Sequence, residues 1–561
     1  MNLTPQQRAA GKANFSAEVS RRGFLKTGLA AGVVAGGGLG AFYFGYTKAH
    51  GDPIRVGVIG TGDEGCVLIG AINPDYLQVT SIADIRPYSI HRAFHGDHYS
   101  DAALAARCGL MTKYGWKTED EARRHVKVYG DYRELIDAEK GNLDGVIIAL
   151  PLHLHAAAAV AAMKAGLHVL TEKLMGHSVH ECKEMARVAK QTNLHLATGH
   201  QRHYNILYHE AMDTIRRGTL GDLHYIRAQW HRGNLPGGDS WQPPMPRELK
   251  PDDKLADALL NQLKSWEARL ATARGREIDT WRKKVTQLRA QLADSTVEAE
   301  KYDYRPIEIK DGANKTVYKG PSAEELIRWR LWDRTGGGLM VELGSHQLDA
   351  ASLFLSAMHD GKKPYPLTVM AAANQPIFPP DREAEDHVAC MFEFPAPGYN
   401  PKSDLDRRRK IGVQYSSING NGFGGYGEMV FGTKGTLILD REQEAMLFLG
   451  GSETKVAVDQ AAAVLDTQAS GAAQTAVAGA VREVSRGYRE QLEHWAWCIK
   501  NPAPENQPKC HPKVALADAV IALVTNQSAR EGRAIEFDEA WFDPDKDDTP
   551  EGVKPDVKRY A

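Results

Sequence analysis

The run Ile54-Arg55-Val56-Gly57-Val58-Ile59-Gly60-Thr61-Gly62-Asp63-Glu64-Gly65 decides the fold. Its first six residues are mostly β-branched and predict a strand, and a helix is expected to continue over residues 67–72. A strand, a GxGxxG loop and a helix in this order are typical of a dinucleotide-binding unit. In such a loop Gly60 permits the tight turn, Gly62 lets the backbone approach a pyrophosphate, and Gly65 lets helix and strand pack closely.

A second strand, predicted over residues 77–83, ends at Asp84, 24 residues after Gly60. A carboxylate at this position accepts hydrogen bonds from the adenosine ribose hydroxyls, which favours NAD as the cofactor. Arg86 lies two residues later and would instead hold a 2′-phosphate, so NADP remains the alternative.

The parallel pattern continues beyond this unit. Residues 144–150 form an almost continuous apolar strand of the type buried on both faces of a parallel sheet. After it come Pro151 and His155, an Ala-rich helix over 156–165 and a strand over 167–171, which predict a right-handed parallel crossover. The loop that holds His155 is expected at the carboxyl edge of the sheet, where cofactors bind.

Motifs along much of the chain resemble the Gfo/Idh/MocA oxidoreductases, the group of glucose-fructose oxidoreductase and inositol dehydrogenase. Residues 336–349 carry the closest likeness, to the signature GGGxxxDxGxHxxD. The other matching stretches are Gly60-x-Gly62-x-x-Gly65, Pro151-x-His153-x-His155, Gly166-x-His168-Val169, Thr171-Glu172-Lys173, residues 199–204, residues 218–223, Gly432-Thr433-Lys434-Gly435 and residues 541–544. The resemblance runs from about residue 53 to 545, with interruptions.

The resemblance implies α/β and α+β domains in sequence. A Rossmann NAD(P)-binding domain is expected over 53–203, and a C-terminal α/β domain with a large open, mostly antiparallel sheet over 204–545. The second domain would bind substrate and join subunits into a homo-oligomer through its sheet. Residues 546–561 are expected to form a tail.

The resemblance also implies three catalytic residues. Lys173 would be the active-site lysine beside the nicotinamide, Glu342 would stand at the usual Asp position, and His346 would be the catalytic histidine. A histidine with a pKa near neutrality suits the removal of a hydroxyl proton. Since Glu342 precedes His346 by one helical turn, its carboxylate is expected to orient the imidazole.

Further site residues are expected around these three. The predicted cofactor contacts are Gly60, Gly62, Gly65, Asp84, Arg86, Pro151, His155, Glu172 and Lys173. The predicted substrate contacts are Arg202, Tyr204, Trp230, His231 and Asp349. Aromatic faces suit sugar rings, and packing in a core or interface is the alternative for the first four.

Two departures from the family pattern affect the site. The usual Glu-Lys-Pro reads Glu172-Lys173-Leu174, and the usual Asp is Glu342, one methylene longer. A non-catalytic dinucleotide-binding protein is therefore one alternative function.

The N-terminal residues have the layout of an export signal. Ser20-Arg21-Arg22-Gly23-Phe24-Leu25-Lys26 resembles the twin-arginine motif, and an uncharged stretch follows over 27–46. Residues 1–52 are thus predicted to be recognised by the twin-arginine translocase. The protein would reach the periplasm or cell envelope, either soluble or held by an N-terminal anchor, since no clear cleavage site precedes Asp52.

Two stretches depart from the family pattern. Over residues 245–321, apolar side chains recur at helical spacing in two runs separated by residues 273–275, which predicts an antiparallel helical hairpin. It is expected to pack on the catalytic domain or on a partner subunit, and coiled-coil dimerisation is the alternative. Residues 452–485 are Ala-rich and fit either a helix or a mobile lid.

Composition excludes several classes of function. With 561 residues, the chain exceeds one ordinary domain, and a net charge of −2 gives no field to attract nucleic acid or anionic lipid. The six Cys are scattered without a CxxC pair, so no metal site is predicted.

These observations favour an exported NAD(P)-dependent oxidoreductase that acts on a sugar, glycoside or polyol. The cofactor is expected to be tightly held and non-exchanging, because the cell envelope has no free nicotinamide pool. An NAD-dependent glycoside hydrolase that works by transient oxidation at C3 is the chief alternative.

Overall fold

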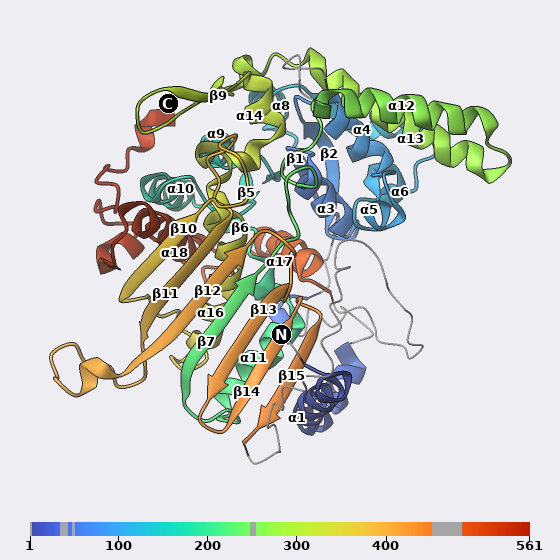
Figure 1. Cartoon of the computed structure of the whole chain (residues 1–561). Coiled ribbons are helices and arrows are strands. Elements are labelled where there is room, and N and C mark those ends of the chain that lie inside the picture. Colours follow the sequence, from blue (N-terminus) through green and yellow to red (C-terminus); the bar gives the residue numbers. More distant parts are fainter. Residues whose placement is uncertain (1–2, 34–42, 48–50, 247–253, 451–484, 561) are drawn as a thin grey trace.

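The computed structural model describes residues 3–33, 43–47, 51–246, 254–450 and 485–560. Two sheets organise these residues, a parallel one formed by the first half of the chain and a larger mixed one formed mainly by the second half (Figure 1). Helices cover both faces of the first sheet and mainly one face of the second, where the N-terminal helix also packs on Met446 and Phe448 of the other face.

The first sheet is wholly parallel, with the strand order β3-β2-β1-β4-β5-β6 of a Rossmann fold. Its strands are β1 (Ile54–Ile59), β2 (Leu77–Ala83), β3 (Lys127–Tyr129), β4 (Gly145–Ile148), β5 (His168–Thr171) and β6 (Leu196–Thr198). Its helices are α3 (Asp63–Ala71), α4 (Pro87–His95), α5 (Asp101–Ala106), α6 (Gly109–Tyr114), α7 (Glu119–His125), α8 (Tyr132–Glu139), α9 (His155–Lys164) and α10 (Val179–Thr192). The predicted Rossmann fold is confirmed.

The second sheet has the order β15-β14-β13-β7-β12-β11-β10-β16, and all its neighbours are antiparallel except β7 and β12. Its strands are β7 (Leu223–Trp230), β10 (Thr368–Asn374), β11 (His387–Pro395), β12 (Lys410–Ile418), β13 (Tyr426–Gly432), β14 (Gly435–Asp440), β15 (Glu444–Leu449) and β16 (Ile535–Glu536). This confirms the predicted large, mostly antiparallel sheet.

Helices α11 (Ile206–Arg216), α16 (Ser345–Ser356) and α18 (Pro512–Glu531) pack on one face of this sheet. Burial alternates strictly along β12, as expected for a strand with one face toward helices and the other toward solvent. Helix α17 (Tyr488–Lys500) lies between the two sheets (Figure 1), and its Trp495 packs against Gly145 of β4. The tail beyond residue 545 lies against α10, where the ammonium of Lys183 donates to the carbonyl of Asp548 at 2.7 Å.

Residues 245–321, which depart from the family pattern, contain the predicted helical hairpin of α12 (Lys254–Thr272) and α13 (Arg276–Ala293). The apolar faces of the two helices meet, with the rings of Trp266 and Trp281 6.3 Å apart. Helix α13 packs on α4 of the Rossmann domain, the first of the expected placements. A short hairpin of β8 (Ile307–Lys310) and β9 (Thr316–Gly320) and helix α14 (Ser322–Ile327) follow, and no periodic pattern had predicted them.

The twin-arginine-like motif lies within α1 (Pro5–Val33), which runs along the edge strand β15. Arg8 pairs with Asp440 at 2.7 Å, and the Asn14 amide donates to the carbonyl of Leu447 at 3.1 Å. In the described part of the chain, no helix has the length and apolar character that crossing a membrane requires. Apart from Ser485, the Ala-rich segment 452–485 lies outside the described residues.

Candidate active site

The three glycines of the β1–α3 loop differ in what surrounds them. A Cβ at Gly60, which has φ +84°, would lie 2.4 Å from the carbonyl oxygen of Ala149, and one at Gly65 would lie 2.0 Å from the carbonyl oxygen of Gly60. A Cβ on Gly62 would meet no atom within 4 Å. Gly60 and Gly65 are therefore required for packing, whereas Gly62 leaves open space at the start of α3, where a phosphate fits.

Asp84 lies at the carboxyl end of β2, beside this loop. Its Oδ2 accepts a hydrogen bond from the amide of Thr61 at 2.7 Å, and its Oδ1 accepts one from the amide of Arg86 at 2.8 Å. Oδ2 also accepts a bond from the Thr61 hydroxyl at 3.3 Å, whereas Oδ1 has one partner and can accept a second bond from a ribose hydroxyl. The side chain of Arg86 turns to the insertion, where its Nε donates to Asp294 at 2.8 Å.

Two acidic residues follow Gly62 in the loop. Asp63 pairs with Arg92 at 2.6 Å, and this guanidinium helps to lower the pKa of Asp63 although its burial acts in the opposite direction. Burial raises the pKa of Glu64 and raises that of Glu172, which also faces the charge of Glu64, well above its usual value. The two glutamates therefore tend to retain a proton, which weakens the repulsion they exert on a phosphate.

Lys173 and Glu342 meet across the two domains. The ammonium of Lys173 donates to the main-chain carbonyl of Glu342 at 2.6 Å and lies 3.3 Å from its Oε2. The other oxygen, Oε1, accepts a bond from Arg330 at 2.7 Å. Burial would raise the pKa of Glu342, but Lys173 and Arg330 outweigh it and lower the pKa to about 2. Glu342 is thus an anion that holds the lysine in place. The Lys173–Leu174 peptide bond is cis.

His346 lies in the first turn of α16, with its ring 5.8 Å from that of Trp230 and 6.1 Å from that of His200. Its Nδ1 has no hydrogen-bond partner among the described residues. Burial, with the charge of Lys173, lowers the pKa of His346 well below its usual value. The imidazole is therefore neutral at pH 7, but it is a weaker base than the histidine of near-neutral pKa expected from the sequence.

The expectation that Glu342 orients His346 is wrong, because the carboxylate binds Lys173 and Arg330 instead. Residues Met340–Gly344 form a π-helical turn, which is wider than an α-helical one. The spacing of four residues that would align the two side chains on an α-helix therefore does not do so here.

One cavity of about 580 Å³ joins the β1–α3 loop to Lys173, Glu342 and His346. It runs from Asp84 past Gly62 to Lys173 and His346, along the carboxyl edge of the parallel sheet. The predicted site residues that line it are Gly60, Gly62, Asp84, Arg86, Pro151, Glu172, Lys173, Trp230, Glu342 and His346. An elongated space of this kind, with glycine at one end and titratable groups at the other, fits a dinucleotide and a small substrate.

Six predicted site residues do not line the cavity: Gly65, His155, Arg202, Tyr204, His231 and Asp349. His155 is buried, and its ring nitrogens lie 2.8 Å and 2.7 Å from the carbonyl oxygens of Leu174 and Leu150. It links the Lys173 loop to the end of β4, which is a positioning role.

The predicted substrate contacts other than Trp230 are engaged elsewhere or lie outside the cavity. Arg202 is buried, binds Glu442 at 2.7 Å, and donates to the main-chain carbonyl of His346 at 2.6 Å. The Tyr204 hydroxyl lies 2.8 Å from Nδ1 of His494. His231 is half-buried just beyond the end of β7. For Arg202 and Tyr204, the structure therefore favours packing in the core over contact with substrate.

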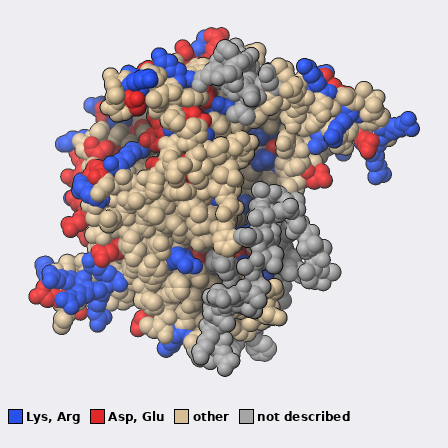
Figure 2. Space-filling model, in the orientation of Figure 1, with Lys and Arg blue, Asp and Glu red and all other residues tan. Residues whose placement is uncertain are grey.

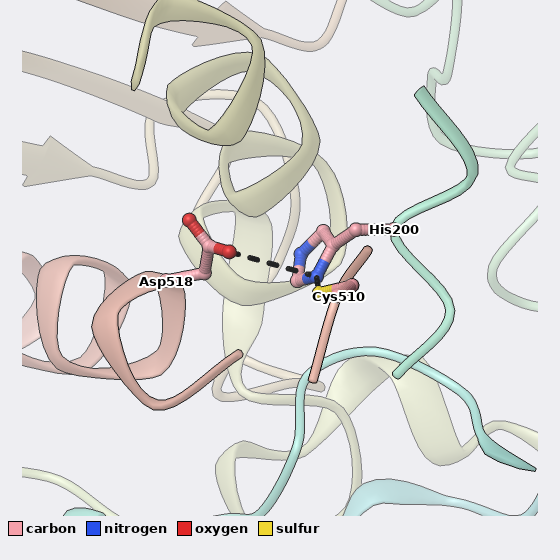
Figure 3. Close-up of side chains that lie close together, drawn as sticks. All are labelled: His200, Cys510 and Asp518. Atoms are coloured by element: carbon pink, nitrogen blue, oxygen red, sulfur yellow. Dashed lines mark hydrogen bonds and ion pairs between the residues drawn. The ribbon is translucent and has the colours of Figure 1, made fainter. Parts of the chain in front are cut away.

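Asp349 belongs to a buried polar cluster behind His346. It accepts from His203 at 2.9 Å and pairs with Lys363 at 3.2 Å, and Lys363 also binds Asp518. The Asp518 carboxylate faces His200, whose Nδ1 lies 3.5 Å from the Cys510 sulfur (Figure 3). Together, His200, Cys510 and Asp518 have the ligand types of a metal site, although no sequence spacing indicated one. The Lys363 ammonium already lies between the two carboxylates, which disfavours a second cation there.

Sequence reasoning missed several residues of the cavity. Two cations, Arg330 and Arg486, and the aromatic side chain of Tyr488 line it. Asp294, Tyr302 and other residues between 291 and 304 line it as well, and Asp294 lies beside Arg86. These residues come from α17 and the two residues before it, from the segment before residue 336 and from the insertion, and no local motif marks them.

Comparisons with known proteins agree with this geometry. The model of an oxidoreductase family with an NAD-binding Rossmann fold matches residues 54–200, and that of the family's C-terminal alpha/beta domain matches residues 311–537. An inositol dehydrogenase homologue from Azotobacter vinelandii, solved with NAD+, shares the fold with a TM-score of 0.53 and 15% identity, over 87% of this chain and 99% of that one.

Two curated relatives match shorter stretches. A glycosyl hydrolase family 109 protein of Stenotrophomonas maltophilia is 29% identical over 204 residues, 35% of this chain and 40% of the relative. The rhizopine catabolism protein MocA of Rhizobium meliloti is 33% identical over 106 residues, 19% of this chain and 33% of the relative. The chain thus spans less than half the length of either relative. Because the two family matches together cover more than half of its residues, the chain belongs to the Gfo/Idh/MocA family of oxidoreductases.

Proposed function

We propose that the protein is an NAD-dependent oxidoreductase that oxidises or reduces a hydroxyl-bearing carbon of a sugar, glycoside or polyol. The observation that carries this proposal is the single cavity that joins Gly62 and Asp84 to Lys173, Glu342 and His346. The residues present fit the cofactor, because Gly62 leaves room for phosphate and Oδ1 of Asp84 keeps a free lone pair for ribose.

When bound, the nicotinamide would supply the acceptor for the hydride that leaves the substrate carbon. The hydroxyl proton must leave at the same time, and neutral His346 accepts it. Lys173 retains a donor beyond its two contacts with Glu342, and this N–H stabilises the negative charge that develops on the substrate oxygen. The oxidation removes two hydrogens from the alcohol: one would leave as a hydride to the cofactor, and the other leaves as a proton to His346.

A single-turnover experiment tests this assignment. Full-length protein loaded with NAD+ is mixed with a panel of sugars, glycosides and polyols, and the formation of reduced nicotinamide is followed by absorbance. We expect reduction by at least one substrate, and a loss of about a hundredfold or more in rate for Lys173→Met and for His346→Gln. Unchanged rates on the true substrate in both variants would refute the site assignment.

Glycoside hydrolysis through transient oxidation is the second candidate, favoured by the likeness to a glycosyl hydrolase family 109 protein. Both reactions use the same hydride acceptor and the same base, so net redox change separates them. Release of the aglycone without accumulation of reduced nicotinamide or keto product would indicate hydrolysis. Accumulation of a keto product with the glycosidic bond intact would indicate oxidoreduction.

We further propose export by the twin-arginine translocase, with the cofactor bound beforehand and retained. The support is the motif Ser20-Arg21-Arg22-Gly23-Phe24-Leu25-Lys26. Replacement of Arg21 and Arg22 by lysine should leave the protein in the cytoplasm of a host that has the pathway. Equal periplasmic amounts of the wild type and the variant would contradict this proposal.

We also propose that the protein forms a homo-oligomer through the C-terminal sheet. The face of this sheet opposite α11, α16 and α18 shows few charged residues over β11, β12, β7 and β13 (Figure 2). Met370 of β10 and Met391 of β11 are cross-strand partners on this face, with 63% and 40% of their surface exposed. An exposed apolar sheet face of this kind is typical of a subunit interface.

A further inference from the structure

The insertion reaches the adenosine end of the cavity, although it lies two hundred residues from the dinucleotide loop in the sequence. Asp294, immediately after α13, is almost fully buried and lines the cavity beside Arg86. Its Oδ2 accepts from Nε of Arg86 at 2.8 Å, and its Oδ1 accepts from the main-chain amide of Tyr88 at 3.0 Å. Both carboxylate oxygens therefore bind the segment that follows β2.

Further contacts hold this part of the insertion in place. The Gln287 side chain, also buried, accepts from the amide of His98 at 2.7 Å and donates to Asp97 at 2.8 Å. Lys284 donates to the carbonyl of Tyr99 at 2.9 Å. Asp294 thus approaches Arg86 from a helix that is fixed to the Rossmann domain.

The charges at this end of the cavity decide which adenosine ribose can bind. Arg86 alone would attract a 2′-phosphate, which carries up to two negative charges. Here Asp294 binds the guanidinium through Nε, whereas Asp84 accepts a hydrogen bond from the main-chain amide of Arg86 at 2.8 Å. The carboxylate of Asp294 offsets the charge of this guanidinium, and a 2′-phosphate would bring further negative charge into a buried site beside Asp84.

We propose that Asp294 makes the protein select NAD over NADP by neutralising Arg86 from the insertion. This inference rests on the proposed NAD-dependent function and assigns to the insertion a role in cofactor specificity. A ribose with a free 2′-hydroxyl is accommodated, because it donates to Asp84 and needs no cation. A 2′-phosphate is rejected, because the cation that would bind it is already paired.

Binding titrations of nucleotide-free, full-length protein with NAD+ and NADP+ test this proposal without any measurement of turnover. In the wild type we expect NAD+ to bind at least about tenfold more tightly than NADP+. In Asp294→Asn, which keeps the size and part of the hydrogen bonding, NADP+ should bind about tenfold more tightly than in the wild type while NAD+ changes little. The double variant Asp294→Asn/Arg86→Gln should lose this gain, because the freed guanidinium is its source.

Asp279→Asn is the matched control, because Asp279 is an exposed aspartate of α13 that pairs with Lys283 away from the cavity. It should preserve the wild-type preference. Should Asp294→Asn fold poorly, Arg86→Gln alone keeps the test decisive. Since Asp294 already neutralises the guanidinium, this change should weaken the binding of NADP+ by less than about threefold.

The outcomes separate this proposal from the proposed function. If NAD+ binds the wild type but Asp294→Asn leaves the NAD+ to NADP+ ratio unchanged, only the role of Asp294 is refuted. A large loss of NADP+ affinity in Arg86→Gln alone would refute it as well, because Arg86 would then be available to phosphate. If the wild type binds neither dinucleotide, the proposed function falls and this inference falls with it.

Discussion

Lys363 shows how a single buried cation supports the region behind His346. It pairs with both Asp349 and Asp518, which are almost fully buried. Burial and the neighbouring Asp349 raise the pKa of Asp518 well above its usual value, whereas the pKa of Asp349 is lowered well below it despite burial, chiefly by His203 and Lys363. One carboxylate is thus ionised and the other tends to hold a proton.

We predict that Lys363→Met lowers the free energy of unfolding by about 3–5 kcal/mol, because it leaves a buried carboxylate without its cation. Urea denaturation measures the change. Lys362→Met is the matched control, since Lys362 is the exposed neighbour and should change stability by less than about 0.5 kcal/mol. Equal stability of the two variants would show that Lys363 is not required by the carboxylates.

At the scale of the element, the Rossmann strands were predictable from the sequence, whereas the π-helical turn that holds Glu342 was not. The bounds of β1 and β2 follow from β-branched runs that end at a glycine loop and at Asp84. The orientation of Glu342 depends on a π-helical turn. Neither the Gly-Gly-Gly pattern nor the spacing of four residues between Glu342 and His346 predicts such a turn. Lys173 and His346 were identified by resemblance, and both line the cavity.

Long-range contacts account for most of what the sequence did not show. Periodicity predicted the hairpin of α12 and α13. Its attachment to the Rossmann domain depends on Gln287, which binds His98 after α4, and on Asp294, which binds Tyr88 of α4, and neither residue stands out in the sequence. Arg202 and Tyr204 seemed suited to substrate because of their residue types. Their partners Glu442 and His494 are more than two hundred residues away in sequence, so their burial could not be foreseen.

The insertion should also govern how fast the cofactor leaves. We predict that Gln287→Ala increases the release rate of bound NAD several-fold, because it removes the side chain that holds α13 to residues 97 and 98. Displacement of labelled NAD by unlabelled NAD measures this rate. Arg289→Ala, a change at an exposed residue of the same helix, should leave it unaltered. An unaltered rate in Gln287→Ala would mean that α13 does not retain the cofactor.

For the whole molecule, buried neutral histidines should make the fold sensitive to acid. Burial lowers the pKa of His153 to about 2 and those of His200 and His494 to about 3, against 6.5 for the unfolded chain. Below pH 6.5 the unfolded state therefore binds protons that the folded state does not, and stability must fall as the pH falls.

We predict a lower free energy of unfolding at about pH 5 than at pH 7, measured by urea denaturation. His153→Leu should reduce this difference, because both ring nitrogens of His153 lack a hydrogen-bond partner among the described residues and no bond is lost. His224→Gln, at an exposed histidine, should not reduce it. Equal pH dependence in all three proteins would contradict the assignment to buried histidines.

Assembly through the C-terminal sheet is a further property of the whole molecule. Met391→Glu places a charge at the centre of the exposed apolar strip and should convert the oligomer into monomers, as measured by light scattering after size exclusion. Leu405→Glu, at a residue 77% exposed outside this sheet, is the control and should keep the wild-type mass. If the Met391→Glu variant kept the oligomeric mass of the wild type, the interface would not lie on this face of the sheet.

We propose that the cavity holds a dinucleotide with its phosphates at Gly62. The most direct test is the amount of NAD released by denaturation from purified wild type and from Gly62→Val, determined by mass spectrometry. Gly62 has φ −65° and open space around its Cβ position, so valine should preserve the fold while it fills the phosphate position. We predict about one NAD per chain from the wild type and almost none from the folded variant. Equal amounts from both proteins, or none from the wild type, would contradict the claim.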